Sequence, residues 1–176
     1  MRGSRNGLAT WVVDGSWVRK NITSTVKPIP TFGATATANL NVSASVSAVC
    51  TISTLPVAFG AYDPVVANAA TDLNGTGTLT VACTKGASAT IDLGVGNNLS
   101  GGTRRMGSGT DFLNYSLYKD AARTQVWGTG MAGGTTYTYN SASKASTNVT
   151  VYGKVPQAQD VTVGSYADVV VATINY

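Results

Sequence analysis

The side chains that could carry out catalysis are few in this chain. The sequence contains no histidine and no glutamate, and its acidic side chains are eight aspartates. A general acid or base would therefore have to be an aspartate, a lysine or a tyrosine. Most of the five aspartates weighed as candidates fall at predicted strand ends or turns, where aspartate commonly caps the backbone: Asp63, Asp72, Asp111, Asp120 and Asp168. No spacing among them indicates a pair of catalytic carboxylates. We expect no enzyme, no cofactor and no metal site.

Two other groups of residues are candidates for binding a ligand. Arg104, Arg105 and Met106 follow a glycine-rich stretch and could hold an anion, but we interpret them as a solvated edge with the methionine turned inward. A tip adhesin or lectin would need exposed aromatic side chains on loops, and Trp127, Tyr137 and Tyr139 are the candidates for such a cluster.

The net charge of +4 does not predict a nucleic-acid-binding surface. The whole positive excess lies in residues 1–33, whereas residues 34–176 hold seven basic and seven acidic side chains. Binding to phosphates requires clustered positive charge on the folded domain. Residues 1–33 lack the long apolar run of a signal peptide, and we interpret them as an atypical basic leader or an extension.

Two cysteines, Cys50 and Cys83, are each flanked by strand-like sequence. They could be free buried thiols, half of a metal site or one disulfide. A zinc site is disfavoured because the chain has no histidine. A polar β-protein with a single cysteine pair is typical of export to an oxidising compartment, which favours the disulfide.

The most informative stretch is residues 34–50, where apolar and polar side chains alternate. All nine even positions are apolar, and seven of the eight odd positions are polar. This pattern predicts an extended strand with one buried face. Seventeen residues would span roughly 56 Å, far more than an ordinary strand of about 17–20 Å. Either two strands follow each other in phase, or one strand crosses between sheets, or half of the segment completes a neighbouring molecule.

The rest of the chain predicts short strands separated by Gly- and Asn-containing turns. The predicted strands are residues 57–62, 77–83, 89–93, 112–119, 135–139, 148–155 and 166–176. This spacing, with few helix-forming residues, predicts an all-β sandwich or barrel. We expect the last strand to run to Tyr176, with no strand after it.

A set of short stretches occurs in an order that is specific as a whole. These are Cys50, residues 59–62, 77–83, 105–106, 113–118, 120–124, 127–128, 151–153, 164–168 and 174–176. With them, the chain from about residue 36 to residue 176 resembles the spore coat protein U-like domain, a family that includes subunits of archaic chaperone–usher pili. The resemblance implies an incomplete immunoglobulin-like Greek-key sandwich, which a donated strand completes.

The resemblance also implies roles for particular residues. Residues 34–45 would be the donor strand segment, and residues 46–176 the pilin domain, with residues 46–50 beginning its first strand. The donor plugs would be Ala36, Ala38, Leu40, Val42 and Ala44. The bridge between Cys50 and Cys83 would match the disulfide of the family. The C-terminal strand that faces the chaperone would present Val170, Ala172, Ile174 and Tyr176.

The function that we expect is therefore that of a structural pilus subunit in a surface fibre. Its partners would be identical or related subunits, a periplasmic chaperone and an outer-membrane usher. It would be exported through the periplasm to the cell surface. The alternative is a secreted spore-coat or cell-surface matrix protein that has the same fold but forms no filament.

Overall fold

We describe the protein from a computed structural model, in which residues 10–13, 16–19, 33, 35–128 and 132–176 are described. The chain divides into two units, residues 1–44 and residues 45–176. In the first unit, β1 (Thr10–Val13) and β2 (Ser16–Arg19) form an antiparallel pair that the sequence reasoning did not predict. Residues 35–44 of this unit form no strand.

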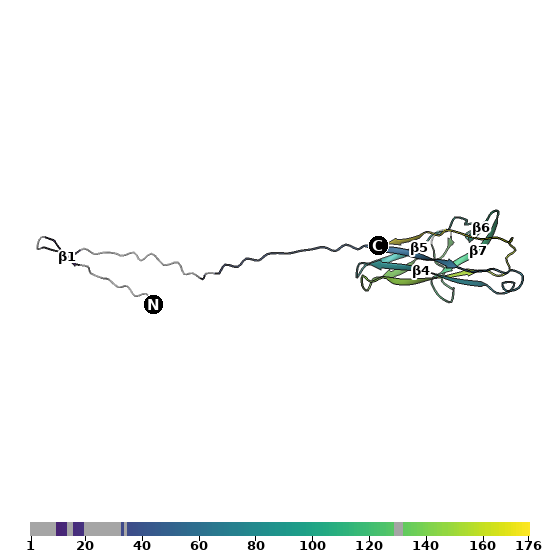
Figure 1. Ribbon diagram of the computed structural model, residues 1–176, viewed down its shortest axis with the longest axis horizontal. Coiled ribbons are helices and arrows are strands. Elements are labelled where there is room, and N and C mark those ends of the chain that lie inside the picture. The colour runs from purple at the N-terminus through teal and green to yellow at the C-terminus, as the bar shows by residue number, and fades with distance from the viewer. Residues whose placement is uncertain (1–9, 14–15, 20–32, 34, 129–131) are drawn as a thin grey trace. The chain divides into compact units, whose positions relative to one another are not determined.

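The second unit is an all-β sandwich (Figure 1). Its strands are β3 (Cys50–Ala58), β4 (Leu73–Cys83), β5 (Ser88–Leu93), β6 (Arg104–Ser108), β7 (Asp111–Tyr118), β8 (Tyr137–Asn140), β9 (Thr147–Val155) and β10 (Ala172–Asn175). One sheet has the order β3-β4-β9-β7-β6 and the other the order β10-β5-β8, with antiparallel neighbours throughout. The predicted all-β, immunoglobulin-like fold is confirmed.

The core lies between the two sheets and is built by strict alternation. On β4 every second residue from Gly75 to Cys83 is buried, and on β9 every second residue from Val149 to Val155. Ala89, Ile91 and Leu93 of β5 supply the facing layer. These residues form one hydrophobic cluster, as the period-2 patterning of each strand requires.

Trp127 stands at the centre of this core and is fully buried. Its indole Nε1 donates a hydrogen bond to the carbonyl oxygen of Ile91 (2.9 Å), and its ring stacks on Tyr137 with centroids 5.2 Å apart. Tyr139 is buried as well. The idea of Trp127, Tyr137 and Tyr139 as an exposed aromatic cluster is therefore wrong, because two of the three side chains belong to the core.

The turn role predicted for aspartates holds at two loops. The carboxylate of Asp63 accepts hydrogen bonds from the backbone N–H groups of Val66 and Val65, which lower its pKa. Asp120 accepts hydrogen bonds from the N–H groups of Gln125 and Thr124, and its pKa is lowered as well. Both carboxylates satisfy backbone donors that the turns leave unpaired.

Three strand predictions need correction. The first domain strand is β3, which begins at Cys50 rather than at Val46 and ends at Ala58; Gly60, with a φ of 79°, then turns the chain, so residues 60–62 are not a strand. Of the predicted strand 166–176, only residues 172–175 form a strand, β10, because residues 166–171 do not pair with an adjacent strand over consecutive residues. Strand β6 was missed, since residues 104–108 carry two arginines and no alternation of hydrophobicity.

Cys50 and Cys83 form the disulfide that the sequence favoured, with an S–S distance of 2.03 Å. The two residues are directly opposite each other in the β3–β4 ladder. β3 is an edge strand of its sheet, and the disulfide ties it covalently to its neighbour in the sheet, β4. Among the described residues there is no helix of the length and hydrophobicity that a bilayer crossing requires.

We predict that replacing Cys50 and Cys83 together by serine lowers the free energy of unfolding by about 3–4 kcal/mol, because the unfolded chain regains the entropy of an open loop. The two residues are separated by 33 positions in the sequence. Urea unfolding followed by tryptophan fluorescence measures this change, with chemically reduced wild-type protein as the matched control. A loss of less than about 1 kcal/mol would contradict the prediction.

Candidate functional site: an open groove between β3 and the C-terminal segment

The two sheets leave two strand edges free on the same side of the sandwich. β3 is the end strand of the five-stranded sheet, and β10 is the end strand of the three-stranded sheet. The two strands contact each other weakly compared with the paired strands of the sheets. We call the space between β3 and residues 161–176, which we term the C-terminal segment, the edge groove.

The degree of burial shows that the core is open along this groove. On β3, the inward-facing residues Cys50, Ile52 and Thr54 lie opposite the buried residues Cys83, Val81 and Leu79 of β4. Their burial nevertheless falls along the strand: Cys50 is buried, Ile52 is half-buried and Thr54 is exposed.

The same loss of burial occurs on the opposite wall. Ala172 and Ile174 of β10 pair with the buried residues Leu93 and Ile91, yet both are only half-buried. A sandwich with all its strands would cover these positions. The core therefore lacks a covering element between β3 and β10.

The first part of the groove is a cavity of about 450 Å³. Its floor consists of core side chains from both sheets: Leu79, Leu93, Tyr115, Leu117 and Val151. Its walls are residues 54–57 of β3 and residues 166–170 and 172 of the C-terminal segment. The lining is mainly apolar.

A second cavity, of about 760 Å³, continues from the first. It lies between residues 57–64 and residues 161–166. Four residues line both cavities and so mark the boundary between them: Val57, Phe59, Met106 and Tyr166.

The carboxylate of Asp168 holds the C-terminal segment against the body of the domain. Its Oδ2 accepts a hydrogen bond from the Tyr115 hydroxyl (2.6 Å), and its Oδ1 accepts one from the backbone N–H of Asn97 (2.8 Å). Burial and the nearby Asp168 carboxylate raise the pKa of Tyr115, so the phenol remains protonated and acts as the donor. Asp168 thus fixes one wall of the first cavity to its floor.

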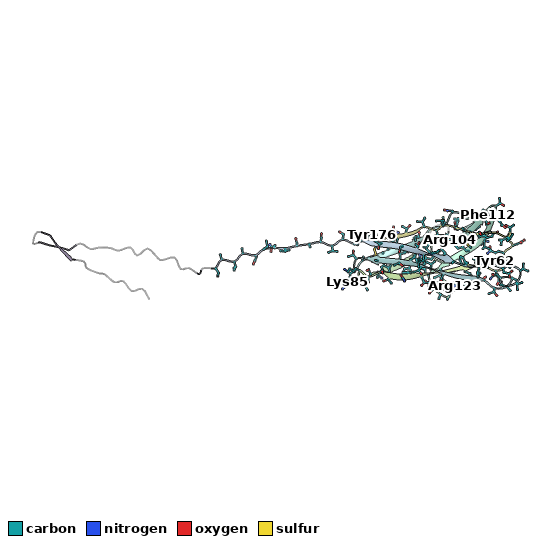
Figure 2. All side chains as sticks on the ribbon, in the orientation of Figure 1. Tyr62, Lys85, Arg104, Phe112, Arg123 and Tyr176 are labelled. Atoms are coloured by element: carbon teal, nitrogen blue, oxygen red, sulfur yellow. A yellow bond between two sulfur atoms is a disulfide. The ribbon has the colours of Figure 1, made fainter. Side chains whose placement is uncertain are left out.

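Arg104 of β6, labelled in Figure 2, is bound to the end of β5. Only 3% of its surface is exposed. Its guanidinium donates hydrogen bonds to the carbonyl oxygens of Gly94 (2.8 Å), Leu93 (2.6 Å) and Trp127 (3.0 Å). Gly94 N–H in turn donates to the carbonyl oxygen of Val171 in the groove wall (2.9 Å). Burial lowers the pKa of Arg104, whereas Tyr115, Asp92 and Asp168 act in the opposite direction.

A second carboxylate anchors the far part of the C-terminal segment. Asp111 accepts hydrogen bonds from the N–H of Thr162 (2.6 Å) and from the hydroxyl of Tyr166 (3.2 Å). These bonds, led by that of Thr162, lower the pKa of Asp111. Between the two anchors, Ala167 and Gly107 form a pair of backbone hydrogen bonds (2.9 and 3.1 Å).

The residues predicted for the C-terminal strand lie at or near the groove, whereas the residues predicted as donor plugs lie in the first unit. Val170 and Ala172 line the groove, Ile174 is half-buried on β10, and Tyr176 is 58% exposed. Ala36, Ala38, Leu40, Val42 and Ala44 lie in the first unit, outside any strand and exposed, Leu40 by 87% and Val42 by 86%.

The prediction for Arg104, Arg105 and Met106 is correct only in part. Arg104 is buried rather than solvated, since three carbonyl oxygens replace its water. Arg105 lies over the ring of Phe112, with its Cζ 4.1 Å from the ring centroid, and its Nε donates to the carbonyl oxygen of Asn98. Met106 is turned inward, as predicted: it packs against the hydrophobic core and lines the groove. Among the residues that the structure describes, no group of three or more His, Cys, Asp or Glu side chains could hold a metal ion.

Comparison with known families is decisive for residues 36–173, which match the model of the Spore Coat Protein U domain. This chain belongs to the spore coat protein U domain family. A curated relative, Protein U of Myxococcus xanthus, is 42% identical over 161 residues, a match that covers 84% of this chain and 88% of Protein U. The resemblance seen in the sequence is confirmed.

A solved structure supports the fold of this family member. It is the chaperone–tip adhesion subunit pre-assembly complex from the archaic chaperone–usher Csu pili of Acinetobacter baumannii. The match has a TM-score of 0.53 and 20% sequence identity, and it covers 75% of this chain and 40% of the matched chain. At this identity the likeness is one of fold.

Sequence reasoning missed the residues that hold the groove of this spore coat U domain together. Tyr115 and Asp168 both belong to stretches that carried the family resemblance, but their 53-residue separation gave no sign that they meet. Phe59 was likewise noted only as part of a stretch. A buried arginine could have been suspected from the sequence at one place, the run Arg104-Arg105-Met106, because these two charges interrupt a region that is otherwise poor in charge.

We predict that Asp168→Ala lowers the free energy of unfolding by about 1–3 kcal/mol, because the buried Tyr115 hydroxyl loses its acceptor. Asp160→Ala, which removes an exposed carboxylate from the same loop, should change it by no more than about 0.5 kcal/mol. Urea unfolding of both variants tests the difference. Equal effects would show that Asp168 does not hold the groove wall.

Proposed function

We propose that this chain is a structural subunit that polymerises by donor-strand complementation into a surface fibre for adhesion and biofilm formation. The observation that carries the proposal is the edge groove, an opening in the core between two free strand edges. A groove of this kind accepts an extended chain, because the free backbone groups pair with it and the cavities receive every second side chain.

The same chain contains a segment of the matching chemistry in residues 34–45. Its apolar positions recur at every second residue, which is the period of a strand, and the segment carries no charged side chain. From Ala36 to Ala44 it comprises nine residues, the same number as β3, the strand along which it would lie.

We assign the plug role to Ala36, Ala38, Leu40, Val42 and Ala44 of a second copy of the chain. Leu40 and Val42 have the largest apolar surfaces of the five, and burying each fully would contribute about 1.5–3 kcal/mol to binding. The three alanines would occupy shallower positions. Residues 46–176 would then be the domain that receives the plug residues.

The partners of such a subunit would be identical or related subunits, a periplasmic chaperone and an outer-membrane usher. The chaperone would protect the groove before assembly by contacting the strand that bears Val170, Ala172, Ile174 and Tyr176. Export through the periplasm to a fimbrium at the cell surface fits the disulfide, which persists in oxidising compartments. A structural role, rather than catalysis, fits the family description.

A second function has an observation of its own. The matching family is described as a spore coat domain, and a relative from Myxococcus xanthus shares 42% of the aligned residues. A secreted coat or matrix protein would have the same fold but no filament. The two functions differ in whether residues 34–45 pass from one molecule into the groove of another.

We predict that Leu40→Asp abolishes assembly of the purified full-length chain, because a carboxylate cannot enter an apolar cavity without losing its hydration. Asn41→Asp adds the same charge to the opposite face of the segment and should leave assembly intact. Sizing, negative-stain electron microscopy and SDS-resistant ladders on gels measure the outcome, and deletion of residues 34–44 provides a second loss-of-assembly variant.

A monomeric wild-type chain that deletion of residues 34–44 leaves unchanged would reject polymerisation and favour the coat protein. Filaments that persist in Leu40→Asp would instead show that a different segment enters the groove.

A further inference from the structure

Phe59 lies where the two cavities of the edge groove meet. It follows directly after β3, is half-buried and lines both cavities. On the core side its ring makes an edge contact with Tyr115, with centroids 6.3 Å apart and planes at 60°. This ring is therefore one of the four side chains that lie at the boundary between the two cavities.

Three glycines under Phe59 and Val57 form a hollow in the five-stranded sheet. Gly75 and Gly153 are directly opposite each other on β4 and β9, and Gly77 follows on β4. All three are buried, face the core and have a backbone that any residue can adopt. Glycine weakens a strand interior, and in such a place it commonly marks a close approach of another group.

The close approach is visible in what a Cβ atom would meet at each glycine. At Gly153 it would lie 2.6 Å from Cζ of Phe59 and 2.8 Å from Cγ1 of Val57. At Gly75 it would lie 2.9 Å from Cδ1 of Phe59, and at Gly77 2.7 Å from Cγ2 of Val57. An alanine at Gly153 would therefore push the Phe59 ring or the Val57 side chain out of the hollow and toward the groove. At Gly75 and Gly77 the Cβ would also meet the backbone of β3, namely the carbonyl oxygen of Ala58 and the nitrogen of Val57, both at 2.9 Å.

We propose that Phe59, seated in this hollow over Gly75 and Gly153, determines which donor side chains the edge groove accepts. The inference rests on the proposed function and takes residues 34–45 of a second copy as the occupant. An incoming strand must present a small side chain where it passes the ring, whereas larger side chains fit in the cavities on either side. Ala36, Ala38 and Ala44 are the small plugs available for the crossing.

The first experiment measures donor selectivity with synthetic peptides of residues 34–45. The acceptor is the full chain carrying Leu40→Asp, so that its own segment does not compete. We expect a leucine at one of the positions 36, 38 or 44 of the peptide to weaken binding at least about tenfold, since this step adds bulk where the ring leaves no space. Adding Phe59→Ala to the acceptor should reduce this discrimination to about threefold or less.

The second experiment moves the ring without removing it. Gly153→Ala should weaken binding of the wild-type peptide at least about tenfold, and the double variant Gly153→Ala/Phe59→Ala should regain most of the loss, because the displaced ring is gone. Gly107→Ala is the matched control: Gly107 is also a strand glycine, but its Cβ would meet nothing closer than 3.4 Å. This variant should bind like the parent.

The outcomes separate the two levels of the proposal. If no peptide binds the parent acceptor, the proposed donor-strand function fails, and the role of Phe59 fails with it. If the peptide binds but selectivity is the same with and without Phe59, the role of Phe59 alone is overturned. Circular dichroism checks that each variant is folded. Should Gly153→Ala fail to fold, the selectivity change in Phe59→Ala remains sufficient to decide.

Discussion

The missing cover over the core between β3 and β10 is the constraint on which the rest of this structure depends. Two strand edges are free on one side of the sandwich, and Ile52, Ala172 and Ile174, which these edge strands turn inward, are only half-buried. Open edges with apolar surface are an aggregation hazard, which most β-proteins avoid by covering or charging them. Among the residues that line the first cavity, Asp168 is the one carboxylate, and its charge is engaged by hydrogen bonds within the domain.

An open core needs walls that keep their positions without a strand between them. The disulfide between Cys50 and Cys83 holds the start of β3 to its single neighbour, and the glycine hollow receives Val57 and Phe59 at its end. On the other side, Arg104 fixes the end of β5, and Asp168 fixes the segment that leads into β10. These contacts use buried polar groups and close packing where a sheet would ordinarily use a ladder of backbone hydrogen bonds.

The sequence was sufficient for the fold class and most strands, because alternation of side chains reports directly on a sheet with one buried face. It was also sufficient for the disulfide, since a lone cysteine pair without histidine leaves few other roles. It failed at β6, whose residues carry two arginines and show no alternation of hydrophobicity, and at residues 166–171, which look like a strand but have no ladder to join. The contacts between Tyr115 and Asp168, and between Phe59 and Gly153, could not be predicted because no local pattern encodes long-range proximity.

Residues 34–50 show that an alternating pattern can indicate a buried face without indicating where in space that face is buried. The alternation predicts a strand with one buried face, yet residues 35–49 form no strand within this chain, and both Leu40 and Val42 are exposed. A pattern of this length, without charge or proline, is costly to leave in water unless a surface elsewhere is shaped for it. The edge groove is the surface that we propose for it: its lining is mainly apolar, and β3, which forms one wall, has nine residues, as many as the proposed plug segment from Ala36 to Ala44. The pattern therefore indicates burial, and in the proposed function the open core of another copy would be the place where that burial occurs.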